Sequence, residues 1–293
     1  MMRLLLLAVT VSMLALGGSP SIVLEWRPAR PVQGSLIQIE ATPAGDSTTT
    51  IEGRFAGEPL HFERVGSSYR ALGAIPLEAG ATARGTVEIN LDGSAGATTS
   101  TLAVPVGRRA VGSERLRAAE RFGRRPDAAL RVRLAHERAQ INVVLDATHD
   151  RPRFWTQAWI RPLPGRVLSG FGARRTFNRV VQSRHHGVDL FARLGDSIHV
   201  ANKGVVALVA DHYYAGRSVW VDHGAGLLTV YLHLSKPLVA TGDTVALGQV
   251  IGLVGNTGRV VAPHLHWSAL YGGISVDPMD LLGPTMRGLT GNP

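Results

Sequence analysis

The residues most able to do chemistry are two histidines near the C-terminus of the chain. Residues 262–267 read APHLHW. In an extended strand, residues two apart point to the same face, so His264 and His266 can place both imidazoles in one cleft. One of them can then hold a metal ion while the other acts on a substrate.

A second histidine-containing segment lies about eighty residues upstream, where residues 184–189 read RHHGVD. His185 and Asp189 are four residues apart across Gly187, near enough to offer a nitrogen and a carboxylate oxygen to one ion. Zinc accepts this ligand mixture at about 2.1 Å, and three protein ligands leave the fourth tetrahedral position for water. Such an open position is typical of a catalytic zinc site.

Each pattern by itself has a simpler explanation. A His-x-His pair is more often part of a solvated strand face than a set of ligands, and His-x-x-x-Asp is a weaker signal still. The distribution of histidines favours the metal site, because eight of the eleven lie between His185 and His266. No other stretch of the chain is so enriched.

The elements that must position these side chains are β-strands. From about residue 160 to residue 282 the sequence consists of short apolar runs separated by turn residues. Residues 195–198 (GDSI) and 242–245 (GDTV) form a weak internal repeat, each typical of a Gly-Asp turn that enters a strand. We therefore expect duplicated β-hairpins. Biotinyl and lipoyl carrier domains share the pattern, but they need a lysine at a hairpin tip, and neither Lys203 nor Lys236 lies in such a motif.

Two regions of different composition precede this segment, as a chain of 293 residues is long enough for about two domains. Residues 23–106 predict a small antiparallel β-sandwich, immunoglobulin-like in type. Residues 107–159, rich in Arg, Ala and Glu, predict a helical connector in which Asp127 caps a helix that runs to about Ala147. The fold class is therefore mainly β. The clearest strands of the sandwich are residues 36–40, 69–72, 86–91 and 101–104.

The first residues of the chain are typical of a secretory signal. Arg3 precedes an apolar run from residue 4 to residue 16, and small residues follow through Gly18. This run has 13 residues, whereas a membrane span needs about 20, so we expect residues 1–18 to be a signal peptide and no span to remain after cleavage. An uncleaved N-terminal anchor is the alternative. No Cys follows the small residues, which excludes a lipid-anchored lipoprotein.

The composition restricts the partners and the chemistry. The formal net charge is +9, and nearly all of the positive charge is arginine. Such a protein is attracted to polyanions, which after export means anionic envelope polymers or acidic lipid rather than nucleic acid. An equally good explanation is that arginine replaces lysine through genome composition. The absence of cysteine removes disulfides, Cys-based zinc sites and thiol nucleophiles.

Five motifs in about the last 120 residues resemble, in order and spacing, those of lysostaphin-type (LytM-like) zinc endopeptidases. These enzymes cut peptide bonds in bacterial peptidoglycan. The fold of that family is a small, strongly bent antiparallel β-domain with a groove across the zinc, which we expect for residues 160–283. The motifs are SGFG at 169–172, HHGVD at 185–189, YLHL at 231–234, GLVGNTG at 252–258 and PHLHW at 263–267.

The resemblance also implies roles for individual residues. His185, Asp189 and His266 correspond to the ligands of one Zn²⁺ ion, and His233 and His264 correspond to the unliganded catalytic histidines beside it. Of these two, His264 is the better candidate for general base, since it shares a strand face with His266. His233 would then donate to the oxyanion or the leaving amine. The reverse assignment stays open.

Two departures from the family pattern matter. His186 adjoins the first expected ligand, so the register could differ by one residue, although the four-residue interval to Asp189 favours His185. Ala262 stands where family members often have glycine, which would narrow the groove slightly. The remaining histidines of the region, His199, His212 and His223, match no ligand position and are expected to be structural.

The resemblance predicts an exported zinc metalloendopeptidase of the periplasm or cell envelope, or a secreted one. Its substrate would be the crosslinks or stem peptides of peptidoglycan, and Arg217 with Tyr213 and Tyr214 are candidates to line its groove. One alternative is a catalytically inactive protein that binds peptidoglycan or activates another hydrolase. A second is a carrier or structural envelope module. The cut bond and the oligomeric state stay undetermined.

Overall fold

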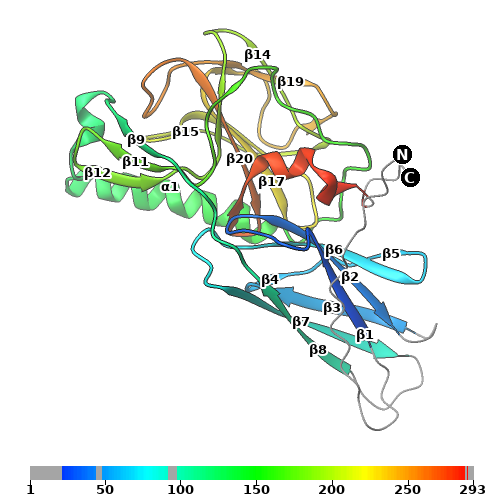
Figure 1. Cartoon of the computed structure of the whole chain (residues 1–293). Coiled ribbons are helices and arrows are strands. Elements are labelled where there is room, and N and C mark those ends of the chain that lie inside the picture. The colour runs from blue at the N-terminus through cyan, green and yellow to red at the C-terminus, as the bar shows by residue number, and fades with distance from the viewer. Residues whose placement is uncertain (1–21, 44–47, 92–97, 288, 290–293) are drawn as a thin grey trace, which may run out of the picture. The chain divides into compact units, whose positions relative to one another are not determined.

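The computed structural model describes residues 22–43, 48–91, 98–287 and 289 (Figure 1). They fall into two compact units, the first ending at Arg108 and the second beginning at Arg109. Both units are built mainly of β-strands, and one α-helix occurs in the described part of the chain. The predicted signal peptide, residues 1–18, lies outside the described residues.

The first unit consists of two four-stranded antiparallel sheets, with strand orders β1-β2-β6-β5 and β4-β3-β7-β8. Buried side chains from both sheets, among them Trp26, Ile39, Phe55 and Val104, form one core. All four predicted runs lie within strands of this unit. The strands are β1 Ile22–Arg27, β2 Leu36–Pro43, β3 Thr48–Phe55, β4 Glu58–Pro59, β5 Glu63–Val65, β6 Ser68–Ala74, β7 Thr82–Leu91 and β8 Thr98–Pro105.

The immunoglobulin-like arrangement of this unit and the domain limits given above stay predictions. The two layers themselves have a simple cause. Buried apolar side chains gather on one face of each sheet, and the two apolar faces bury each other.

A ten-stranded sheet is the centre of the second unit. Its main path runs β10-β13-β20-β17-β16-β15-β18, with β14, β19 and β21 attached to it. The strands are β10 Val167–Ser169, β13 Val188–Phe191, β14 Ser197–His199, β15 Gly204–His212, β16 Gly216–Asp222, β17 Leu227–Pro237, β18 Thr244–Val245, β19 Val250–Val254, β20 His264–Tyr271 and β21 Ile274–Val276. Short 3-10 helices follow at Pro278–Leu282 and Pro284–Met286.

The two Gly-Asp turns have the same local geometry. Gly195 and Gly242 both have positive φ, at 89° and 98°. In each turn the aspartate carboxylate accepts a backbone N–H from three residues earlier, at 2.7 Å for Asp196 and 2.8 Å for Asp243. The repeat therefore encodes a recurring turn, while the duplication of whole hairpins stays a prediction.

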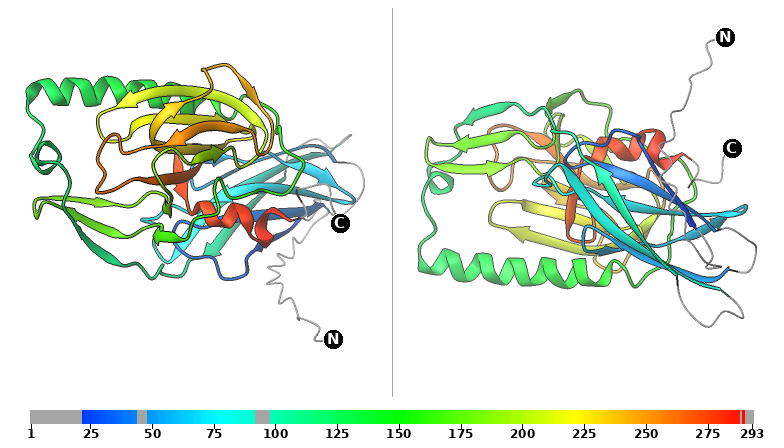
Figure 2. Two further views of the ribbon diagram at one scale, coloured as in Figure 1. Left: turned by 90° about the horizontal axis from the view of Figure 1, so that it is seen from above. Right: turned by 60° about the horizontal axis from the view of Figure 1, so that its bottom comes forward.

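The single helix, α1 Ala128–Ala147, packs along the sheet of the second unit (Figure 2). The Asp127 carboxylate caps it by accepting the backbone N–H of Leu130 at 2.8 Å, as the sequence predicts. Val144, with neighbouring apolar side chains, packs against Trp220 and Val230 of the sheet. None of the helices among the described residues is both long enough and apolar enough to span a membrane.

A short strand in the connector was not anticipated. β9 Ser113–Leu116 pairs in parallel with β11 Arg174–Phe177, and β11 pairs on its other side with β12 Val181–Arg184. The 3-10 helix Glu120–Gly123 separates β9 from α1. The connector is therefore not only helical. Its strand β9 brings residue 114 beside the strands that carry the histidines.

Candidate active site

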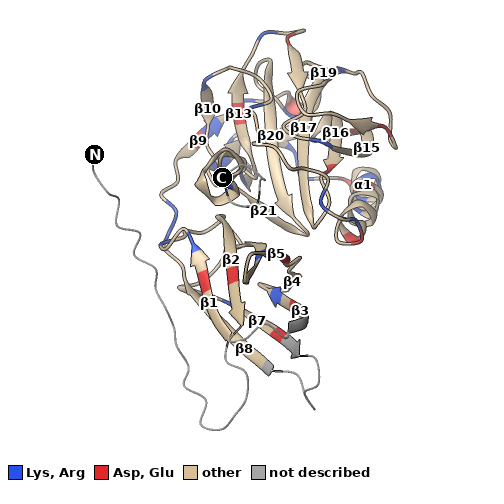
Figure 3. Cartoon of the chain, turned by 90° about the vertical axis from the view of Figure 1, so that its right-hand side faces the viewer, with Lys and Arg blue, Asp and Glu red and all other residues tan. Residues whose placement is uncertain are grey.

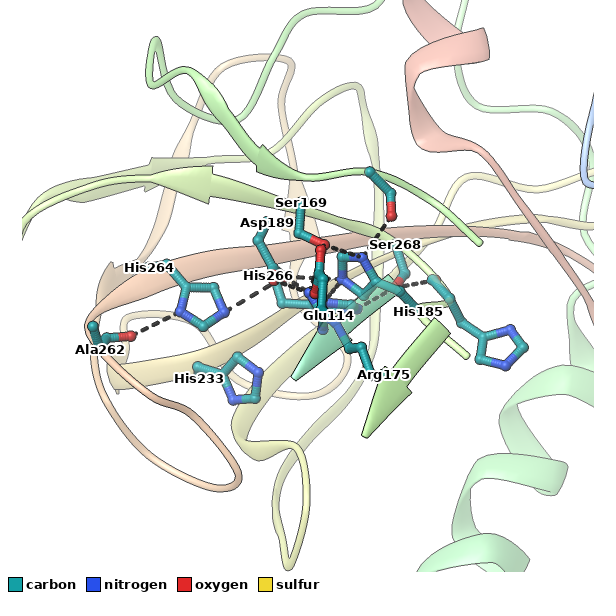
Figure 4. A network of polar contacts seen from close by, with 12 residues as sticks. Glu114, Ser169, Arg175, His185, Asp189, His233, Ala262, His264, His266 and Ser268 are labelled. Atoms are coloured by element: carbon teal, nitrogen blue, oxygen red, sulfur yellow. Dashed lines mark hydrogen bonds and ion pairs between the residues drawn. The ribbon is translucent and has the colours of Figure 1, made fainter. Parts of the chain in front are cut away.

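Three buried side chains from separate parts of the second unit converge on one point (Figure 4). His185 Nε2 lies 3.0 Å from Asp189 Oδ1 and 3.0 Å from His266 Nδ1. His266 Nδ1 lies 2.9 Å from Asp189 Oδ1. These atoms form a nearly equilateral triangle.

The other nitrogen of each imidazole fixes where its proton resides. His185 Nδ1 lies 2.8 Å from the carbonyl oxygen of Gly170, which can only accept, so Nδ1 carries the proton. His266 Nε2 lies 2.8 Å from the Ser268 hydroxyl, which itself donates to the carbonyl of His186 at 2.7 Å, so Nε2 carries the proton. In a neutral imidazole with its proton held in this way, the nitrogen that faces the triangle presents a lone pair.

Three acceptors facing one another at about 3 Å repel unless a cation lies among them. The donor set is right for zinc, which binds imidazole nitrogen and carboxylate oxygen. The spacing also fits, since a zinc tetrahedron with bonds of about 2.0–2.1 Å has edges of about 3.3 Å. Histidine ligands typically donate their outer N–H to a carbonyl or another acceptor, as both imidazoles do here.

Strand register explains why these residues meet. In the antiparallel pair of β13 and β20, Asp189 lies directly opposite His266. Residues in such a pair share a face of the sheet, so the carboxylate and the imidazole point the same way. Figure 3 shows an acidic band on β13 beside β20, which has no charged residue; the band is Asp189, the one acid of that strand.

Gly187 lets the first ligand reach the others. A Cβ atom there would lie 2.5 Å from the carbonyl oxygen of Trp267 and 2.7 Å from His266 Nε2. A side chain at this position would therefore displace β20 or the imidazole itself. The register ambiguity in this segment is resolved by geometry, because His185 is buried in the triangle whereas His186 is exposed.

His264 and His233 stand beside the triangle. The ring of His233 lies 5.1 Å from that of His264 and 5.9 Å from that of His266, measured between centroids. His264 Nε2 is 3.5 Å from Asp189 Oδ1. Their Nδ1 atoms lie 2.8 Å and 2.9 Å from the carbonyl oxygens of Ala262 and Thr257, respectively. Each ring thus has its Nδ1 proton bound to backbone and its Nε2 available for proton transfer.

The backbone of His233 departs from regular strand geometry to achieve this placement. In β17, Leu232 pairs with His266 and Tyr231 pairs with Trp267, so strict alternation would turn His233 to the face opposite His266. Its φ of 67° is left-handed, which is strained for a non-glycine residue. The inversion puts His233 on the same face as His264 and His266. Strained backbone of this kind concentrates at functional sites.

Burial and the carboxylate set the charges of these groups. Burial lowers the pKa of His266 to about 4 and, together with the neighbouring imidazoles, lowers that of His233, so both are neutral at pH 7. Burial also lowers the pKa of His264, but its contact with Asp189 outweighs burial and the net shift is upward. Burial raises the pKa of Asp189, and its contacts with the three histidines more than reverse this, to well below the ordinary value.

An ion-pair network holds the far oxygen of the carboxylate. The Arg175 guanidinium donates to Asp189 Oδ2, to the Ser169 hydroxyl at 2.8 Å and to Glu114 Oε2 at 2.9 Å. The Ser169 hydroxyl donates to the second oxygen of Glu114. Sequence reasoning missed these residues because no local spacing connects Glu114 of β9 with Asp189, and the only signal was Ser169 within the SGFG motif.

A cleft of about 350 Å³ opens beside these groups. Asp189, His233 and His264 line it, together with Glu114 and Arg175 of the network. Ala262, the position where glycine was expected, lies in its wall. The site therefore combines a candidate metal centre, two further imidazoles and room for a substrate.

The other candidate residues lie elsewhere. His199 contacts the Gly248 carbonyl at 2.8 Å, and His212 contacts the Gln140 side chain at 3.1 Å. Arg217 donates to the Ser235 carbonyl and is not among the residues lining the cleft.

The two candidate tyrosines, Tyr213 and Tyr214, lie in different surroundings. Tyr213 packs edge-on against Phe122, at 5.1 Å between ring centroids. Tyr214 lines a second cleft next to the triangle.

Comparison with known proteins points to the same segment. Residues 183–278 match the family model described as Peptidase family M23. Peptidoglycan DD-endopeptidase ShyA of Vibrio cholerae is 43% identical over 117 residues, covering 39% of this chain and 27% of that protein. DD-carboxypeptidase/endopeptidase Mpg of Neisseria meningitidis is 36% identical over 120 residues, covering 41% of this chain and 28% of that protein. The chain spans little more than a quarter of the length of these relatives.

A solved structure extends the likeness beyond this segment. A crystal structure from Pseudomonas aeruginosa, assigned to peptidase M23, superimposes with a TM-score of 0.65 at 25% sequence identity. The alignment covers 86% of this chain and 95% of that chain. The chain therefore shares the fold of that structure over most of its length.

Proposed function

Because residues 183–278 carry a domain of peptidase family M23, we propose that the protein is a zinc-dependent endopeptidase that hydrolyses peptide bonds of bacterial peptidoglycan. The observation that carries the proposal is the triangle of His185 Nε2, Asp189 Oδ1 and His266 Nδ1, whose lone pairs face one another. These three atoms would hold the ion. A bound zinc ion supplies Lewis-acid polarisation and lowers the pKa of water to about 7.

The residues of the chain would handle the protons. His264 lines the cleft with its Nε2 3.5 Å from Asp189 Oδ1, and it would act as general base. His233 lines the same cleft and would serve the oxyanion or the leaving amine. The Thr257 and Ala262 carbonyls hold both rings in the required tautomer.

The substrate follows from the names of the relatives. The Vibrio cholerae relatives are named peptidoglycan DD-endopeptidases, which favours the peptide crosslinks of peptidoglycan over glycine bridges. Access to that polymer requires export, for which the signal-like residues 1–18 provide the means. We therefore propose that the protein acts in the periplasm or cell envelope.

Purified peptidoglycan provides the direct test. The full chain is loaded with zinc, its metal content is measured, and fragments released from peptidoglycan are identified by mass spectrometry. We expect one zinc ion per chain and cleaved crosslinks or stem peptides, both abolished by chelation.

Intact sacculi after prolonged incubation with folded, zinc-loaded protein would overturn the proposed enzyme. If the protein then also bound peptidoglycan, a noncatalytic binding or activating role would replace it. A protein that neither holds zinc nor binds peptidoglycan would be a structural module.

A further inference from the structure

A second cleft, of about 220 Å³, adjoins the metal triangle and is lined by arginines. We call it the arginine cleft; its walls include Arg175, Arg184, Arg259, Phe177, Tyr214 and His233. No Asp or Glu occurs among its lining residues. Guanidinium groups in the walls of a small cleft that are not paired with a carboxylate make its potential positive.

Two of these arginines already have roles within the protein. Arg175 is neutralised by Glu114 and Asp189. Arg184 donates to the carbonyl oxygen of Gly172 at 3.0 Å. Arg259 is different, because no carboxylate in the described part of the chain lies within ion-pair distance of its guanidinium.

Arg259 is nevertheless held firmly. Its guanidinium carbon lies 4.1 Å from the centroid of the Phe177 ring and 4.6 Å from that of the Tyr214 ring. Its backbone N–H donates to the Tyr214 carbonyl at 2.9 Å. Stacking on two aromatic rings orients the planar group while leaving its N–H donors without an acid to bind.

Such a side chain has the properties of a binding residue. A half-buried charge loses part of its hydration and is usually paired within the protein. Here the pairing partner is missing, the orientation is fixed, and the residue lines both the arginine cleft and the larger cleft beside His264. The planar fork of arginine matches a carboxylate in bidentate geometry.

We propose that Arg259 binds a carboxylate of the peptide substrate in the arginine cleft and so selects substrates with a free carboxylate near the cut bond. The inference rests on the proposed function and adds a substrate class to it. A carboxylate is the expected anion because it is the negatively charged group of a peptide. Arg184 lines the same cleft and adds to its positive potential.

Two matched substrates test this selection. One is a crosslinked peptide dimer released from peptidoglycan with its carboxylates free, and the other is the same dimer with those carboxylates amidated. We expect the wild-type chain, loaded with zinc, to cleave the free form with a kcat/KM about 10–100 times higher, as is usual for a charge-assisted hydrogen-bonded contact. Arg259→Met should remove this preference and leave cleavage of the amidated dimer within about threefold of wild type.

Two further variants separate charge from packing. Arg259→Lys keeps the charge but lacks the planar fork, so we expect it to recover only part of the preference. Arg217→Met removes an exposed arginine that pairs with Asp211 outside the arginine cleft, and it should leave the preference unchanged. Zinc content and thermal unfolding are measured for every variant to establish that each is folded and metal-loaded.

The outcomes distinguish the two proposals. If the wild type cleaves both dimers equally well, or if Arg259→Met slows both equally, the carboxylate role is wrong while the peptidase stands. If folded, zinc-loaded wild type cleaves neither dimer, the proposed function fails. Calorimetric binding of the two dimers then decides the role of Arg259, and equal dissociation constants for free and amidated forms would overturn it.

Discussion

The second unit contains buried histidines of two kinds, candidate metal ligands and a structural histidine. His266 and His185 belong to the metal triangle, and His223 lies in the turn between β16 and β17, against the ring of Trp159. Their exposed fractions are 7%, 2% and 0%. Burial lowers the pKa of His266 and of His223 alike, to about 4. The two groups are therefore nearly the same in burial, and His266 and His223 share the same lowered pKa.

The difference lies in the second ring nitrogen. His223 Nδ1 lies 2.8 Å from the Lys203 carbonyl, and its Nε2 lies 2.7 Å from the Thr229 hydroxyl, so the protein satisfies both nitrogens. In the triangle, one nitrogen of each imidazole meets only other acceptors. A satisfied pair of nitrogens indicates a structural histidine, and a converging set of lone pairs indicates a ligand.

The largest expected effect separates ligand from base. His266→Ala should lose both zinc and peptidoglycan hydrolysis, whereas His264→Ala should keep one zinc ion per chain and slow hydrolysis about 10²–10⁴-fold. Metal analysis and fragment release are measured on the same samples, with His223→Gln as the control that keeps zinc. If His264→Ala loses zinc and His266→Ala retains it, the ligand assignment is wrong.

The network behind the triangle should be sensitive to loss of its cation. Arg175→Met leaves Asp189 and Glu114 without their partner, so we expect the metal-free protein to lose about 3 kcal/mol of unfolding free energy. Zinc should restore part of that loss, because the ion gives Asp189 a new counter-charge. Denaturant unfolding with chelator measures the loss of stability, and the same titration with zinc measures how much of it is restored. A variant as stable as wild type without metal would show that the network is dispensable.

His223, the structural histidine, should make the free energy of unfolding depend on pH. The pKa of folded His223 is about 4, against about 6.5 in an unfolded chain. Above pH 6.5 both states are neutral, and as the pH falls the unfolded chain binds a proton that the folded one does not. Between pH 7 and pH 4 this group should therefore remove roughly 3 kcal/mol of stability.

The pH effect is isolated by comparing the wild type with His223→Gln. The variant should have a shallower decline in unfolding free energy over the same interval, measured by denaturant titration at each pH. Equal declines in the two proteins would mean that His223 is protonated in the folded state.

The smallest expected effect comes from the two hydroxyls that support the two groups. Ser268→Ala removes the acceptor of His266 Nε2, so it should weaken zinc binding about tenfold and also cost about 1–3 kcal/mol of metal-free stability. Thr229→Val leaves His223 Nε2 without a partner and should cost about 1–3 kcal/mol of stability with zinc affinity unchanged. Chelator competition measures the zinc affinity of each variant, and thermal unfolding measures its stability. If both variants behaved alike, the contrast between the groups would disappear.

Much of the site could be read from residue types and local spacing. The two histidines of the His-x-His pair share a strand face. Asp189 lies on the neighbouring strand, so a single strand pairing brings these residues together. The capped helix from Ala128 to Ala147 was likewise local, since Asp127 and a helical repeat are sufficient to define it. The strands of the first unit followed from simple alternation.

Other features depended on the tertiary structure alone. His233 faces the site because its backbone takes a left-handed φ, against the alternation that sequence predicts. Glu114 reaches Arg175 because β9 pairs in parallel with β11, a contact between segments about sixty residues apart. Arg259 becomes an unpaired, oriented cation only when Phe177 and Tyr214 enclose it.

The sequence by itself determined which side chains could bind a metal and on which strands they lie, because residue type and two-residue alternation are local properties. The tertiary structure decided which nitrogens are left as lone pairs, which face His233 takes, and which arginine is free to meet a substrate. Those properties arise from cross-strand pairing and from packing between distant segments, and neither is encoded in the spacing of any one motif.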